Sequence, residues 1–237
     1  LSNTLHRIAS SPRLASGDWS ATICISEPDA GSDVRRIGTK ASLNDDGKWT
    51  INGEKCWISF GDQDLTSRIG HFLLAKTSAD LISLFLVPDR FGEQRNTIIV
   101  RRIEEKLGLH LSPTCALGFE DAKAYLLGEQ GRGLQQLFVM IRHMRLATAV
   151  QGAGIASRAY ATAKAYAADR KQGGNGPTPL AIECHADIQR MLLSMASRLE
   201  TLRGLIQITA KHIDLADNAT SPAQKAHSAA LTAWLLP

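Results

Sequence analysis

The chain has 237 residues, of which 44% are hydrophobic, and its 27 Lys or Arg against 23 Asp or Glu give a net charge of +4. This length fits one large domain or two small ones. The basic residues are spread rather than clustered, so no nucleic-acid-binding patch is evident. No apolar run approaches the ~20 residues of a membrane span, and the start lacks the apolar core of a signal peptide. Because the sequence opens on Leu1 rather than Met, we expect a fragment.

Short apolar runs separated by Gly, Asp, Asn and Pro follow one another from Trp19 to Leu127. Repeated short strands with turn signals between them predict a β-barrel or a sandwich. Asp45-Asp46-Gly47 predicts a tight turn, and Asn52-Gly53 is a strong hairpin signal. The predicted strands are Ala21–Ser26, Gly38–Asn44, Trp49–Ser59, Gly70–Lys76, Ile82–Val87, Ile98–Leu107, Cys115–Glu120 and Ala124–Leu127.

The first predicted strand ends in a turn with the sequence Ser26-Glu27-Pro28-Asp29-Ala30-Gly31-Ser32-Asp33. Proline has no N–H group, so the strand ladder must end there. The turn leaves serine hydroxyls and backbone N–H groups at its rim, which suits a polar ligand edge or a phosphate. On turn chemistry alone, an ordinary hairpin corner is the favoured interpretation.

Trp57 and Ser59 lie together at the end of another predicted strand. A large flat aromatic beside a hydroxyl donor suits a fused-ring cofactor. Taken alone, Trp57 is more simply explained as a core residue.

The second half of the chain has apolar residues at three- and four-residue steps, which predicts helices. The stretch Leu134–Arg170 is rich in Ala and predicts one or two long helices suited to a bundle or an oligomer interface. Lys171–Pro179 breaks the pattern, and Ile182–His212 resumes it. Ser221 as N-cap and Pro222 at the first position predict a last helix. Strands followed by helices indicate two domains.

The four cysteines are far apart, and none forms a spacing typical of a metal site. We expect them to be reduced, buried thiols of an intracellular protein. They are Cys24, Cys56, Cys115 and Cys184.

Two motifs resemble those of the acyl-CoA dehydrogenase family. The turn Ser26–Asp33 is similar to the T-E-P-x-A-G-S-D motif of that family, and Ile51–Ser59 is similar to its I-N-G-x-K-x-W-I-[TS] motif. The resemblance continues nearly to the end of the chain, through Glu105–Gly108, Leu127–Leu134, Ala168–Gln172 and Ile188–Leu193. Ile58–Thr66 and Leu111–Cys115 resemble the branch that contains 3-methylmercaptopropionyl-CoA dehydrogenases.

The resemblance implies an α+β multidomain fold, with a β-barrel middle domain followed by an all-α helical-bundle domain. It implies a remnant of an N-terminal helical domain over residues 1–18, with that domain otherwise missing. The barrel domain would occupy residues 19–128, and a truncated helical domain residues 129–237.

The resemblance also implies FAD as the cofactor. In the family, the backbone around Ile25 and the hydroxyl of Ser26 face the pyrimidine side of the flavin. Trp57 packs on the ring, Ile58 lies beside it, and the Ser59 hydroxyl reaches toward the nitrogen that accepts hydride. Serine replaces the commoner threonine at Ser26, which keeps the hydroxyl.

Arg170 matches an arginine that reaches the FAD pyrophosphate of a neighbouring subunit, which would require a homodimer or homotetramer. Without the resemblance, a solvated arginine at a helix C-terminus is the favoured interpretation.

Acyl-CoA is the implied substrate, and Ser32 and Arg145 match positions near it. A turn-stabilising role for Ser32 is equally open. Arg142 stands where relatives commonly have Asp or Asn, and we expect it to repel Arg145 one helical turn away. An ordinary surface histidine is the favoured interpretation of His143.

The implied reaction is α,β-dehydrogenation of an acyl-CoA thioester, with electron-transfer flavoprotein as the acceptor. A glutamate removes the α proton in the family, and its motif does not occur here. Glu183 and Glu200 are in the wrong sequence context, so we expect the base to lie beyond Pro237 and the isolated chain to be inactive. We expect a bacterial cytoplasmic protein, or a mitochondrial matrix protein in a eukaryote, with no nucleic-acid partner and no membrane span.

Three alternatives remain open from the sequence. The first is an alkylation-response flavoprotein of the same fold that binds nucleic acid. The second is a non-catalytic flavin-binding or assembly module. The third is an acyl-CoA oxidase, which differs in the access of oxygen to the reduced flavin.

Overall fold

The computed structural model describes residues 12–78, 81–91 and 93–236. The chain forms two compact units, the first ending at Phe138 and the second beginning at Val139. Most of the predicted remnant of an N-terminal helical domain lies outside the described residues, and Pro12–Ser16 forms a short helix, α2. The domain boundaries after residues 18 and 128 remain predictions.

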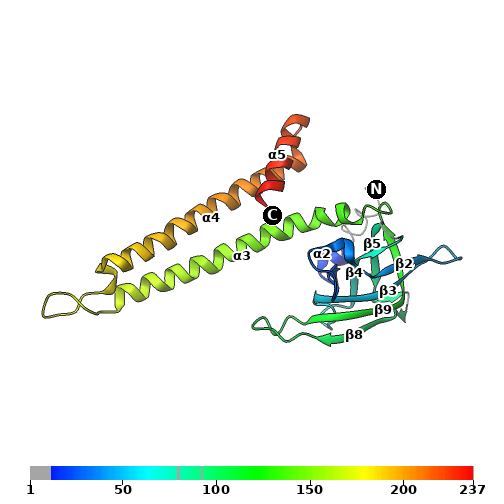
Figure 1. Cartoon of the computed structure of the whole chain (residues 1–237), viewed down its shortest axis with the longest axis horizontal. Helices are drawn as coiled ribbons and strands as arrows, with labels where there is room; N and C mark the ends of the chain where they lie inside the picture. Colours follow the sequence, from blue (N-terminus) through cyan, green and yellow to red (C-terminus); the bar gives the residue numbers. More distant parts are fainter. Residues whose placement is uncertain (1–11, 79–80, 92, 237) are drawn as a thin grey trace. The chain divides into compact units, whose positions relative to one another are not determined.

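Five strands of the first unit close into a barrel (Figure 1). Strand β4 pairs with β2, β2 with β3, β3 with β9, β9 with β5, and β5 again with β4. Strand β1 extends the sheet parallel to β4, and β8 adds antiparallel to β9. The strands are β1 (Trp19–Cys24), β2 (Lys40–Leu43), β3 (Trp49–Ser59), β4 (Arg68–Lys76), β5 (Ile82–Pro88), β6 (Arg90–Phe91), β7 (Gln94–Arg95), β8 (Ile98–Ile103) and β9 (Thr114–Leu127), with a 3-10 turn η1 (Val34–Arg36).

The barrel has one apolar core, to which alternate residues of the strands contribute. Ile51 and Ile58 from β3 meet Leu73 from β4, Phe85 from β5 and Leu117 from β9, and all five are at most 2% exposed. This arrangement confirms the barrel rather than the sandwich, because the sheet closes on itself.

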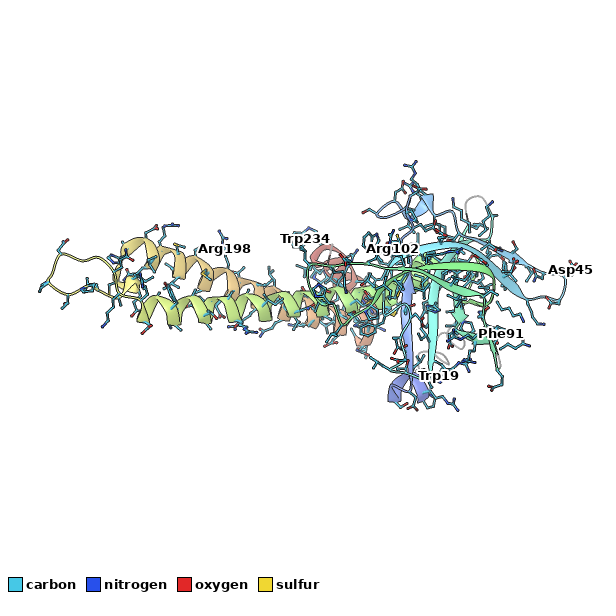
Figure 2. All side chains as sticks on the ribbon, turned by 90° about the horizontal axis from the view of Figure 1, so that it is seen from below. Trp19, Asp45, Phe91, Arg102, Arg198 and Trp234 are labelled. Atoms are coloured by element: carbon cyan, nitrogen blue, oxygen red, sulfur yellow. The ribbon has the colours of Figure 1, made fainter. Side chains whose placement is uncertain are left out.

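The predicted turn at Asp45-Asp46-Gly47 is confirmed. It joins β2 to β3, with Gly47 at φ +75° and its N–H donating to Asn44 O. Asp45 stands at the tip of this hairpin (Figure 2).

The hairpin predicted at Asn52-Gly53 is wrong, because β3 runs through both residues. The Asn52 side chain instead reaches across to β9, donating to Asp121 Oδ1 at 2.7 Å and accepting from Asp121 N at 2.9 Å. Asp121 has φ +52° and lies at a register shift, so β9 bends there without ending. The two strands predicted for residues 115–127 are therefore one.

The second unit is helical. It contains most of α3 (Gly133–Asp169), then η2 (Ile182–Cys184), α4 (Ala186–Asn218) and α5 (Pro222–Leu235). The stretch predicted over Leu134–Arg170 is thus one helix, which ends at Asp169. The break at Lys171–Pro179 is a loop, and the segments on its two sides pair through Lys171 and Ala181. The Ser221 hydroxyl accepts from Gln224 N, which confirms the predicted cap of α5. Among the described residues, no helix combines the length and the apolar character needed to cross a membrane.

Candidate functional site

The ends of β1 and β3 meet on the barrel. Cys56 N, near the end of β3, donates to Ser26 O, just after β1, at 2.9 Å. The sequence predicts Ile25, Ser26, Trp57, Ile58 and Ser59 as one site, and this bond brings the two segments together.

A buried ion pair fixes the same junction. Lys55 on β3 is fully buried, and its Nζ donates to Glu27 Oε1 at 2.7 Å and to Ile25 O at 3.0 Å. The Glu27 carboxylate also accepts from the backbone N–H groups of Gly38 and Thr39. Both carboxylate oxygens of Glu27 and two of the three Lys55 N–H donors are therefore hydrogen-bonded, in line with the need of a buried charge for partners.

The ionisation of this pair follows from its surroundings. Burial lowers the pKa of Lys55, and the nearby Glu27 carboxylate opposes that shift. Burial alone would raise the pKa of Glu27, but the Lys55 ammonium and the hydrogen bonds from Lys55, Thr39 and Gly38 together lower it. We conclude that the carboxylate is ionised near neutral pH and that the pair is a salt bridge.

Trp57 adopts a backbone conformation that bulky residues rarely take, with φ +61°. It lies at a register shift in the pairing of β3 with β9, where three steps along β3 match two along β9. This bulge turns the indole outward, and Trp57 is 60% exposed. Such strain costs about 1–3 kcal/mol and is typical of binding sites. The core position considered for Trp57 is therefore wrong.

The neighbours of Trp57 divide between core and surface. Ile58 is 2% exposed and packs into the barrel core, so only its backbone is available to a ligand. Ser59 is exposed and Ser26 is half-buried. Neither hydroxyl bonds to any residue that the structure describes. The junction thus presents one flat aromatic face and two free hydroxyl donors, which suit a planar ligand with a polar edge.

Two family descriptions match the chain. Residues 22–122 match the acyl-CoA dehydrogenase middle domain, and residues 131–233 match the acyl-CoA dehydrogenase C-terminal domain. The chain belongs to the acyl-CoA dehydrogenase family. The predicted fold class is confirmed as well, since a barrel domain is followed by a helical one.

Several relatives are known by sequence or structure. The 3-methylmercaptopropionyl-CoA dehydrogenase of Ruegeria pomeroyi is 38% identical over 95% of this chain and 41% of that protein. A butyryl-CoA dehydrogenase of Syntrophomonas wolfei is 34% identical over 95% of this chain and 41% of its own length. The solved butyryl-CoA dehydrogenase of Megasphaera elsdenii is 27% identical with a TM-score of 0.71, over 91% of this chain and 53% of that one. The chain spans about two-fifths of the length of the curated relatives named here.

The predicted repulsion between Arg142 and Arg145 is offset by partners on other helices. Arg142 Nη2 donates to both carboxylate oxygens of Asp217 on α4, each at 2.9 Å. Arg145 Nη1 donates to Leu236 O, just after α5, at 2.7 Å. The two arginines therefore hold three helices of the unit together, and His143 between them is exposed, as expected.

Of the remaining predicted positions, Ser32, Arg170 and Glu200 are exposed, and Glu183 is half-buried. Ser32 lies in the turn after β1, and Arg170 follows the last residue of α3, as expected of a helix C-terminus. Glu183 is in η2, and Glu200 pairs with Arg203 at 2.6 Å. Cys184 is exposed, which corrects the expectation of four buried thiols, while Cys24, Cys56 and Cys115 are buried.

Sequence reasoning missed the roles of Glu27 and Lys55, although both stand in the matched motifs. A signal was present, because strand side chains alternate between faces. Lys55 has the same parity as Ile51 in β3 and so faces inward. A lysine on the inner face of a barrel demands a buried acceptor.

A cavity of about 270 Å³ in the barrel unit includes none of the predicted cofactor-binding residues. It is lined partly by Gln63, Asn96 and His71. The side-chain amides of Gln63 and Asn96 form hydrogen bonds with neighbouring loop and strand residues. We therefore place the candidate site at the junction of β1 and β3 rather than in this cavity.

Proposed function

We propose that this chain forms the flavin-facing part of an FAD-dependent acyl-CoA dehydrogenase. The observation that carries the proposal is the exposed, strained Trp57 beside the free hydroxyls of Ser26 and Ser59. A related acyl-CoA dehydrogenase from Bacillus anthracis, solved in complex with FAD, is 25% identical with a TM-score of 0.74, over 98% of this chain and 39% of that one.

Each residue of the site has a distinct task in this proposal. Bound FAD supplies the hydride acceptor for dehydrogenation of an acyl-CoA thioester. Trp57 covers one face of the ring and excludes water there, while the Ser26 and Ser59 hydroxyls donate to its polar atoms. Ile25 and Ile58 contribute backbone, and the bulge of β3 holds the indole in place before the cofactor binds.

The family supports a proposal for the substrate and for the electron acceptor. We propose an acyl-CoA thioester as the substrate, with Ser32 and Arg145 near it. A solved glutaryl-coenzyme A dehydrogenase in complex with glutaryl-CoA is 30% identical with a TM-score of 0.71, over 86% of this chain. We propose an electron-transferring flavoprotein as the acceptor, because a neighbour at 28% identity and a TM-score of 0.70 comes from a study of one in Acidaminococcus fermentans.

We place no catalytic base in this chain. Glu183 in η2 and Glu200 in α4 do not belong to the matched motifs, and the glutamate expected beyond Pro237 remains a prediction. The low activity expected of the isolated chain remains a prediction for the same reason.

We propose that the helical unit takes part in a homodimer or homotetramer, with Arg170 reaching a cofactor phosphate of a second subunit. Large apolar side chains exposed on its helices support this, among them Ile155, Leu193 and Trp234. We propose a bacterial cytoplasmic location; the curated relatives named above come from bacteria, which supports the bacterial source.

Fluorescence titration of the purified chain with FAD tests the proposal. We expect wild-type chain to bind FAD and Ser59→Ala to bind about fivefold more weakly, because one hydrogen bond is worth about 1 kcal/mol. Ser42→Ala is the matched control, since Ser42 is an exposed strand serine on β2. Failure of the folded wild-type chain to bind FAD, or equal losses in both variants, would contradict the proposal.

A further inference from the structure

The buried Lys55–Glu27 ion pair is not explained by stability alone. Burying two charges has a desolvation cost that their attraction only partly offsets, so stability alone is a weak reason for such a pair. Lys55 is fully buried, yet its Nζ lies 3.0 Å from the carbonyl of Ile25, a residue at the proposed flavin edge.

The two charges of the Lys55–Glu27 pair lie at different distances from the Ile25–Ser26 peptide. The negative end of the pair, the Glu27 carboxylate, is bound by the N–H groups of Gly38 and Thr39 in the segment before β2. The positive end, the Lys55 ammonium, faces the Ile25–Ser26 peptide. The charge nearer that edge is therefore positive.

The peptide between Ile25 and Ser26 transmits this charge. In a trans peptide the C=O and N–H groups point in opposite directions. The Ile25 carbonyl points to the buried Lys55 ammonium, so the Ser26 N–H points away from it. That N–H donates to no acceptor among the described residues. The Lys55 ammonium, bound to the Ile25 carbonyl, polarises the peptide and makes the Ser26 N–H a stronger hydrogen-bond donor.

The backbone of this edge is fixed from two sides. Lys55 holds Ile25 O, and Cys56 N holds Ser26 O at 2.9 Å. Because Lys55 and Cys56 are adjacent in β3, one strand clamps both carbonyls beside the Trp57 bulge.

We propose that Lys55, held by Glu27, is a positioning residue that orients the Ser26 N–H toward the flavin and favours its reduced form electrostatically. This inference rests on the proposed function. Reduction increases the electron density on the ring, and a strengthened donor with an ammonium behind it stabilises that density.

The test compares the reduction potential of bound flavin in wild type and in Lys55→Met/Glu27→Gln. Removing both charges together leaves no unpaired buried ion, so the double variant is expected to fold. We expect the ratio of reduced to oxidised flavin at a fixed potential to fall about tenfold, which is about 30 mV for a two-electron couple. FAD affinity measured on the same samples should fall several-fold.

Two controls separate this role from a structural one. Ile51→Val loosens the same strand without changing charge, and it should lower the unfolding temperature while leaving the potential unchanged. Arg101→Met/Glu120→Gln removes an exposed ion pair of the barrel and should change neither.

The outcomes are distinguishable. A double variant with wild-type potential and affinity overturns the inference and leaves the proposed function intact. A potential that shifts equally in Ile51→Val overturns it as well. If the wild-type chain binds no FAD, the proposed function fails first, and the inference fails with it.

Discussion

At the scale of single residues, the site depends on side chains placed against their usual preferences. Trp57 is exposed and strained, and Lys55 is buried. The sequence motifs pointed to Trp57, Ser26 and Ser59 as ligand-facing residues through family resemblance. Composition and periodicity alone favoured a core tryptophan, because they carry no information on the bulge that turns it outward.

His71 gives a prediction at the same scale. It is 2% exposed, its Nδ1 lies 2.8 Å from the Thr22 hydroxyl, and burial lowers the pKa of His71 to about 4, with Asp89 opposing the shift. The unfolded chain therefore binds more protons between pH 6.5 and 4, and stability falls as the pH drops through that range. We expect His71 to account for about 2–3 kcal/mol of the loss between pH 7 and pH 4.5.

Urea unfolding at the two pH values checks this in wild type and in His71→Gln, whose amide can still bond Thr22. The variant should lose less stability on acidification than wild type. Equal losses in the two proteins would show that His71 is not a buried neutral group.

At the scale of elements, strand β3 shows how far sequence patterns reach. Its bounds, Trp49–Ser59, and the cap of α5 were predicted correctly. One or two long helices were predicted from residue 134, and the structure has one, α3. The hairpin predicted at Asn52-Gly53 was wrong because the pairing of β3 with β9 overrides the local turn signal. Gly53 is needed for close approach to Thr39 rather than for a turn, and sequence spacing does not reveal such a contact.

Gly53→Ala tests this interpretation of β3. A Cβ at Gly53 would lie 2.7 Å from Thr39 Cα, and Gly53 has φ +152°. We expect a loss of about 2–4 kcal/mol in the free energy of unfolding, from overpacking and backbone strain together.

Gly108→Ala is the matched control for this substitution, because no atom lies within 4 Å of its added Cβ. It should change the free energy of unfolding by less than about 0.5 kcal/mol. Similar effects of the two substitutions would contradict the close contact between Gly53 and Thr39.

At the scale of the whole molecule, the chain joins a closed barrel to a helical unit, and both match the same family. In the proposed function, the barrel contributes one edge of the flavin site, at the junction of β1 and β3. The substrate, acceptor and oligomeric state were predictable from resemblance only as proposals, because they depend on surfaces that composition and periodicity do not define.

The most direct test of the central claim is the visible circular dichroism of FAD added to the chain, compared between wild type, Trp57→Leu and Trp234→Leu. Trp234 is the matched control, because it is also exposed but belongs to the helical unit. We predict an induced flavin signal in wild type and Trp234→Leu that is largely lost in Trp57→Leu. A signal unchanged in Trp57→Leu, or absent from the folded wild-type chain, would contradict a flavin site at the junction of β1 and β3.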